Sequence, residues 1–170
     1  MARPRPDLRR LRRQCAAVID DLRLPSRADL PSLCSHLAEV RKRPLHVVPV
    51  ALIEQPCGMW VATRDADWIF VDDGTSPAHQ EHILLHEIGH LICGHEGGAQ
   101  DVAAFFPDLD PDLVHATLAR TTYSDEQEQQ AEVMAYLLAE VLRAPGFAAA
   151  DDVTARIADS LNHSARREQR

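Results

Sequence analysis

Residues 76–93 read SPAHQEHILLHEIGHLIC, and they contain both a helix start and a cluster of histidines. Ser76 followed by Pro77 is typical of a helix start, because the serine hydroxyl caps a backbone amide and proline has no amide to leave unpaired. Apolar side chains then form an arc on one side of the segment: Leu84, Leu85, Ile88, Leu91 and Ile92. This pattern predicts an amphipathic helix that ends at about Cys93, before Gly94.

Two histidines and a glutamate lie in the second half of this helix, as His86-Glu87-Ile88-Gly89-His90. Residues four apart differ by about 40° around a helix, so both imidazoles can reach one metal ion. Glu87 lies roughly 60–100° away from them, too far round to be a ligand but well placed to accept a proton from an attacking water. This HExxH pattern predicts a zinc (Zn²⁺) site with His86 and His90 as ligands and Glu87 as the general base.

A third ligand is needed, because catalytic zinc sites usually have three protein ligands and an open fourth position. A second helix start, at Ser124, leads into Glu128-Gln129-Gln130-Ala131-Glu132, where two carboxylates lie four residues apart on one face. Small alanine side chains border this face and allow two helices to approach closely. Without the HExxH helix, this stretch would be interpreted as a solvated acidic helix face. Because the two histidines need a third ligand, we predict Glu128 as that ligand and Glu132 as the acceptor of a hydrogen bond from a ligand imidazole.

Other residues near the motif have competing interpretations. His82 and His86 are also four residues apart, but Ile83 occupies the position of the base, so we expect His82 beside the site or on the surface. His95 falls one residue short of the register in which a third histidine ligand follows HExxH, so we do not expect it to bind the metal. Cys93 has three possible roles: contact with the metal, a redox trigger, or packing in the core. Packing is the usual role of an intracellular cysteine on a helix.

The rest of the chain predicts further helices and a small sheet. Helices are expected at residues 7–22, 28–42, 111–119, 124–143 and 151–163, and strands at 45–52, 58–63 and 67–71. Short connections between the strands favour a three-stranded antiparallel meander. The expected fold class is α+β: a helical bundle carrying the HExxH and third-ligand helices, packed on a small three-stranded antiparallel sheet, with two N-terminal helices.

Length and composition limit the domain count and the environment. A chain of 170 residues, 45% of them hydrophobic, is expected to form one domain, with a helical preface at 1–43, a core at 44–146 and a C-terminal helix with a charged tail at 147–170. The four cysteines form no CxxC pair, no signal-peptide pattern is present, and no apolar run approaches the roughly 20 residues of a membrane span. We therefore expect a reduced, cytoplasmic protein that does not associate with membranes.

The N-terminal residues are basic although the net charge of the chain is −8. Six arginines occur there: Arg3, Arg5, Arg9, Arg10, Arg12 and Arg13. A short basic terminus in an acidic protein is usually a solvated tail, and the sequence has no helix-turn-helix, zinc-finger or RNA-binding signature. We expect no direct binding of nucleic acid.

Two stretches, HEIGHLICGH at 86–95 and EQQAEVMAYLL at 128–138, resemble the ImmA/IrrE family of metallo-endopeptidases, in which HExGH is followed by ExxAN and an apolar helix. The resemblance covers about residues 66–145. It implies zinc on His86, His90 and Glu128, Glu87 as the base, and a gluzincin-like core of active-site helices against a small antiparallel sheet. Glu132 departs from the family pattern, which usually has asparagine there, and the interval between the two stretches is longer than expected.

The resemblance also implies a partner. Family members typically cleave a DNA-binding repressor of the helix-turn-helix type, often in a mobile element or a stress response, so transcription regulation is the implied context. By the same resemblance, strand 67–71 is expected at the sheet edge beside the cleft, where an extended substrate would pair with it.

The sequence also offers three candidate hydrogen-bond donors to the negative charge of the transition state, His115, Tyr123 and Tyr136, and spacing does not choose among them.

Two other function classes compete with a zinc-dependent endopeptidase. One is a catalytically silent, zinc-stabilised interaction module or toxin–antitoxin component. Glu87 and Gly89 argue against it, because a structural site needs no base and usually has a fourth protein ligand. The other is a metal-free helical regulator, which requires the histidine pair to be a coincidence. The sequence therefore favours the peptidase, acting on peptide bonds of a protein substrate.

Overall fold

The computed structural model describes residues 7–25, 28–51, 57–63, 65–95 and 123–143. In chain order the described elements are α1 (Leu8–Leu22), α2 (Leu30–Arg41), β1 (Leu45–Val50), β2 (Gly58–Ala62), β3 (Asp67–Asp72), α3 (Pro77–Cys93) and α5 (Asp125–Leu142). The α+β class is confirmed, and each of these elements lies within two residues of its predicted bounds. The helices predicted at 111–119 and 151–163 lie outside the described residues.

The sheet is mixed, so the predicted antiparallel meander is wrong. Its strand order is β1-β3-β2, with β2 antiparallel to β3 and β1 parallel to β3. The predicted turn between β2 and β3 does form, closed by a hydrogen bond from the Thr63 amide to the Ala66 carbonyl. β1 instead pairs along the other side of β3, because a short connection alone does not decide which edges hydrogen-bond. β3 is consequently the central strand, and the expectation that strand 67–71 forms the edge beside the cleft is also wrong.

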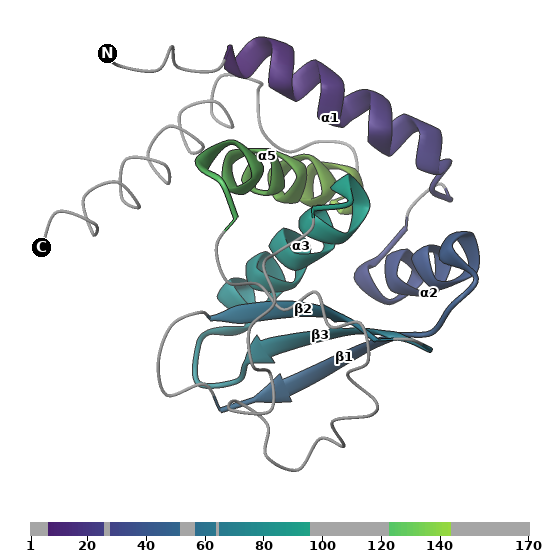
Figure 1. The fold of residues 1–170 in the computed structure, drawn as a ribbon, viewed down its shortest axis with the longest axis vertical. Helices are drawn as coiled ribbons and strands as arrows, with labels where there is room; N and C mark the ends of the chain where they lie inside the picture. The colour runs from purple at the N-terminus through teal and green to yellow at the C-terminus, as the bar shows by residue number, and fades with distance from the viewer. Residues whose placement is uncertain (1–6, 26–27, 52–56, 64, 96–122, 144–170) are drawn as a thin grey trace, which may run out of the picture.

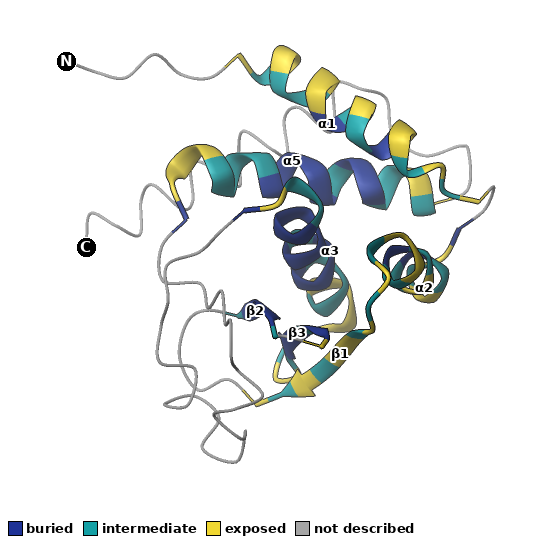
Figure 2. Cartoon of the chain, turned by 45° about the vertical axis from the view of Figure 1, so that its right-hand side comes forward, coloured by how far each residue is buried: buried dark blue, intermediate teal, exposed yellow. Residues whose placement is uncertain are grey.

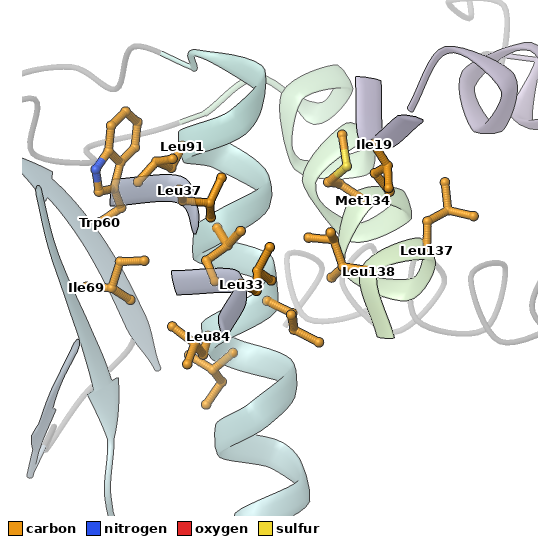
Figure 3. Packing of buried hydrophobic residues seen from close by; sticks show 14 of the residues in the cluster. Ile19, Leu33, Leu37, Trp60, Ile69, Leu84, Leu91, Met134, Leu137 and Leu138 are labelled. Atoms are coloured by element: carbon orange, nitrogen blue, oxygen red, sulfur yellow. The ribbon is translucent and has the colours of Figure 1, made fainter. Parts of the chain in front are cut away.

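α3 lies between the sheet and α5, and α2 packs beside β1 (Figure 1). It packs against β2 and β3 on one side and against α5 on the other, and α1 covers α5. One hydrophobic cluster runs through these layers (Figure 3), and its fully buried members include Leu33, Leu37, Ile69, Leu85, Ile88, Leu91, Met134 and Leu138. Each such side chain contributes about 1.5–3 kcal/mol when it leaves water. α3 is therefore held from both sides, and most of its segment from Ile83 to Leu91 is buried (Figure 2).

Gly89 allows α3 and α5 to come into backbone contact. A Cβ atom built on Gly89 would lie 2.8 Å from the carbonyl oxygen of Ala131 and 3.1 Å from its Cα. Ala131 and Ala135 are fully buried. This arrangement agrees with the prediction that small side chains beside Glu128 permit a close helix approach, and it brings the start of α5 next to the motif on α3.

A buried carboxylate ties the end of α2 to the sheet. Asp67 is almost fully buried and lies 2.8 Å from Nε of Arg41 and 3.3 Å from Nε of Arg43. The indole Nε1 of Trp60 donates to the other oxygen of Asp67 at 3.2 Å.

Within the described part of the chain, no helix is both long and apolar enough to cross a membrane.

Candidate metal centre

Serine caps begin both helices of the site, as predicted. The Ser76 hydroxyl accepts from the His79 amide at 3.4 Å. The Ser124 hydroxyl accepts from the Gln127 amide at 3.3 Å, and the Gln127 side chain accepts from the Ser124 amide at 3.0 Å. These caps set where each helix starts and hence which side chains face the neighbouring helix.

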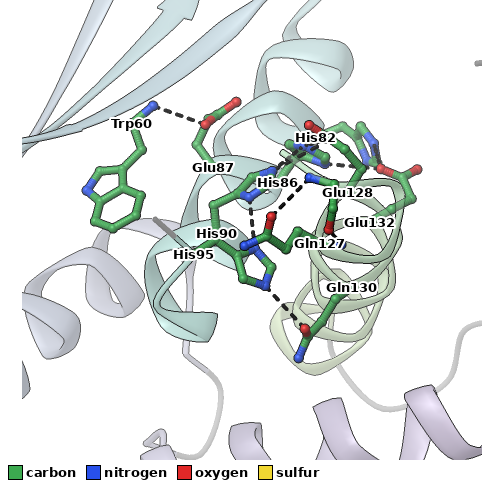
Figure 4. Close-up of polar contacts among 11 residues, drawn as sticks. Trp60, His82, His86, Glu87, His90, His95, Gln127, Glu128, Gln130 and Glu132 are labelled. Carbon is green, nitrogen blue, oxygen red and sulfur yellow. Dashed lines mark hydrogen bonds and ion pairs between the residues drawn. The ribbon is translucent and has the colours of Figure 1, made fainter. Parts of the chain in front are cut away.

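His86 and His90 from α3 meet Glu128 from α5 (Figure 4). One possible ligand atom from each lies within 4.8 Å of the others. Nε2 of His86 is 3.0 Å from Nε2 of His90 and 3.2 Å from Oε2 of Glu128, and Nε2 of His90 is 3.7 Å from that oxygen. Ligand atoms around one tetrahedral zinc ion are about 3.3 Å apart, so this trio fits a single ion.

Carboxylates make this point favourable for positive charge. Burial of His86 lowers its pKa, but hydrogen bonds to Glu128 and Glu132 and the charge of Glu87 outweigh burial and raise the pKa to about 9. The imidazole therefore holds a proton where a metal ion would bind. The same negative field would favour a divalent cation.

Glu132 lies behind His86, on the side away from the shared point. Its Oε2 is 3.3 Å from Nδ1 of His86 and 3.3 Å from Nε2 of His82. Burial raises the pKa of Glu132, but the hydrogen bonds with the two histidines hold it well below its usual range, so the carboxylate is ionised. Because Nδ1 of His86 can donate to this carboxylate, Nε2 is the nitrogen that would bind a metal ion once its proton is displaced. His82 thus lies beside the site and contacts Glu132.

Glu87 lies on the side of α3 that faces β2. It is buried, and its Oε2 accepts a hydrogen bond from the backbone amide of Trp60 at 3.0 Å (Figure 4). A Cβ atom on Gly58 would lie 3.1 Å from Oε1 of Glu87 and would clash with Cγ2 of Ile83, so a larger residue there would have to displace these side chains. Helical geometry separates Glu87 from the two histidines, as the motif predicts, and β2 supplies its contacts.

His95 contacts His90 on the side away from the shared point, a contact that the residue spacing did not predict. Its Nδ1 lies 2.9 Å from Nδ1 of His90, and its Nε2 lies 3.2 Å from Oε1 of Gln130 on α5. Gly94 adopts a left-handed conformation with φ of 64°, so the chain turns back and the His95 amide donates to the His90 carbonyl at 3.1 Å. Glycine at the end of α3 was the available signal, since it reverses the chain there.

Aromatic and thiol groups complete the surroundings. The Tyr123 ring stacks on the His90 ring, with centroids 3.7 Å apart, and Tyr136 lies 5.4 Å from His82. His115 lies outside the described residues.

Cys93 packs against the core, and burial together with the nearby Cys15 raises its pKa to about 12. A thiol held in its protonated form suits packing and does not suit metal binding or redox chemistry.

Comparison with known proteins identifies a peptidase family. A family model described as the IrrE N-terminal-like domain matches residues 39–150. This region contains the sheet and both helices of the site, whereas α1 and most of α2 precede it. The chain matches no curated protein and no solved structure. Since the match spans more than half of the chain, the protein belongs to the family of IrrE N-terminal-like domains, which are metallopeptidase-like.

Proposed function

We propose that this protein is a zinc-dependent endopeptidase that hydrolyses peptide bonds of a protein substrate. The meeting of His86, His90 and Glu128 at one point carries this proposal. Membership in a peptidase family supports the reaction class.

The donor set supports zinc as the metal. Two histidines and one glutamate form a known ligand set of catalytic zinc sites, and three protein donors are typical of catalytic rather than structural zinc. When bound, zinc would lower the pKa of water to about 7 and polarise the carbonyl oxygen of the peptide bond.

Glu87 would move the proton. Its carboxylate is oriented by the Trp60 amide and shielded from bulk water by burial. In the proposed reaction it accepts a proton from the attacking water and returns it to the leaving amine, the usual role of a general base that then acts as an acid. Glu132 would orient His86 through Nδ1 and keep Nε2 available as a ligand.

The substrate class follows from the family resemblance. We propose a DNA-binding repressor of the helix-turn-helix type, which would place the protein in transcription regulation. In this proposal the peptidase recognises the repressor as a protein, without contacting DNA itself.

The substitution Glu87→Gln tests the reaction. Wild-type protein and the variant are produced in cells, and new protein N-termini are identified by mass spectrometry, with bound metal measured on the purified proteins. We expect wild type and variant to carry one equivalent of zinc and only the wild type to generate new N-termini. Glu81→Gln is the matched control, since it removes the same charge from α3 outside the site.

The outcomes separate the proposals. New N-termini that persist in zinc-loaded Glu87→Gln would overturn the assignment of the base. Zinc binding with no cleavage by the wild type would instead favour a silent, zinc-stabilised module. If the cleaved protein had no DNA-binding segment, the repressor proposal would be wrong while the peptidase proposal stood.

A further inference from the structure

A chain of hydrogen bonds runs from α5 to the metal-facing histidine of α3 (Figure 4). Oε1 of Gln130 lies 3.2 Å from Nε2 of His95, and Nδ1 of His95 lies 2.9 Å from Nδ1 of His90. The remaining ring nitrogen of His90, Nε2, faces His86 and Glu128. Each ring nitrogen in this chain therefore has a defined neighbour.

We propose that Gln130 and His95 are positioning residues that hold His90 in the tautomer able to bind the metal, an inference that rests on the proposed zinc site. An amide oxygen only accepts hydrogen bonds, so Nε2 of His95 must carry the hydrogen. A neutral imidazole has one N–H, which leaves Nδ1 of His95 as an acceptor. His90 then donates from Nδ1, and its Nε2 keeps a lone pair for the metal.

The opposite arrangement cannot bind a metal. If the amide nitrogen of Gln130 faced His95, every donor in the chain would reverse, and Nε2 of His90 would carry hydrogen at the shared point. The three residues thus act as one unit, in which the orientation of a glutamine side chain decides whether His90 is a ligand.

Burial makes this chain necessary. His90 is fully buried and His95 is 5% exposed, so water has little access to their ring nitrogens, and buried polar groups need partners from the protein. The turn at Gly94 brings His95 back onto His90, and the stacked Tyr123 ring restrains the plane of the His90 ring. His86 differs, because a carboxylate, Glu132, fixes its tautomer directly.

Variants of Gln130 test the proposal through zinc affinity, measured by competition with a chromogenic chelator. Gln130→Leu removes the acceptor, and we expect zinc to bind about ten- to a hundredfold more weakly, as for other residues that orient metal-binding histidines. Gln130→Glu keeps an acceptor oxygen and should stay within about threefold of wild type. Gln129→Leu is the matched control, because the same change points about 100° away around α5.

The histidine side chains give a second readout that a purely structural role would not move. Long-range ¹H–¹⁵N spectra of wild type should show the N–H of His95 on Nε2 and that of His90 on Nδ1, and Gln130→Leu should lose this single pattern. Wild-type zinc affinity in Gln130→Leu, or the N–H of His95 on Nδ1 in the wild type, would overturn the inference alone. A wild type that bound no zinc would overturn the proposed function and this inference with it.

Discussion

Replacing Gly89 with alanine tests whether the contact between α3 and α5 sets the geometry of the metal centre. The added Cβ would lie 2.8 Å from the Ala131 carbonyl oxygen, 3.1 Å from the Ala131 Cα and 3.3 Å from the Met134 Cβ. The two nearest atoms belong to the backbone, so no side-chain rotation relieves the clash. The helices must move apart instead.

The size of this movement follows from the contact distances. An ordinary contact begins at 3.4 Å, so α5 must shift by about 0.6 Å at Ala131. Overpacking of this kind costs about 1–3 kcal/mol, and the higher helix propensity of alanine offsets about 1 kcal/mol of it. We expect the free energy of unfolding to fall by up to about 2 kcal/mol. Zinc–ligand distances stay within about 0.2 Å of their usual values, so zinc should bind at least about tenfold more weakly once Glu128 is displaced by more than this.

Two measurements follow this substitution: urea unfolding of the metal-free protein by circular dichroism, and chelator competition for zinc. Gly74→Ala is the matched control, because Gly74 is exposed and the nearest atom to its added Cβ is a side-chain oxygen of Asp72, at 3.2 Å. The control should change neither quantity appreciably. If Gly89→Ala raised stability by the propensity gain and kept wild-type zinc affinity, the close helix approach would not be what positions Glu128.

Three further predictions concern other parts of the site and fold. Asp67→Ala leaves partly exposed arginines without their buried carboxylate partner and should lower the free energy of unfolding by about 3 kcal/mol in urea titrations; a loss below about 1 kcal/mol would contradict this. The pKa of His86 is about 9 in the metal-free protein, so zinc must displace a proton from this ring below that pH. The apparent zinc dissociation constant should therefore fall about tenfold per pH unit from pH 6.5 to about 9 and then level off. A dissociation constant that did not change with pH would refute this competition. The stability that this raised pKa gives the metal-free protein is complete below pH 6.5 and is lost as the pH rises through about 9. Gly58→Ala forces a Cβ against Ile83 and Glu87 and so displaces the proposed base. It should slow cleavage of the substrate that the wild-type enzyme cleaves by about ten- to a hundredfold, without changing zinc affinity. Unchanged cleavage would show that Glu87 tolerates displacement.

Local signals made the helices predictable. The caps at Ser76 and Ser124 depend only on residues within one turn, so the sequence alone placed the start of α3 and α5. The spacing of His86, Glu87 and His90 likewise fixed their directions around one helix. Bringing Glu128 to them required a second helix, and the small side chains of Ala131 and Ala135 were the signal that the two helices could approach closely.

Non-local pairing was not predictable from these signals. The order of strands in the sheet depends on which edges of β3 are covered, and a short connection between strands carries no information about that. The contact between His90 and His95 depends on the left-handed turn at Gly94. Helical spacing does not describe residues beyond that turn, so it could not place His95. Both errors arose where the chain changes direction.

The cover that α1 provides for α5 has a consequence for shortened versions of the protein. α1 precedes residues 39–150, yet its Cys15 and Ile19 are buried in the shared core, and its Arg12 forms an ion pair with Glu140 of α5 at 3.1 Å. A fragment cut to the family boundaries would expose an apolar stripe on the helix that supplies Glu128, and it would favour self-association over a stable monomer. The folding unit is thus larger than the segment by which its family is identified.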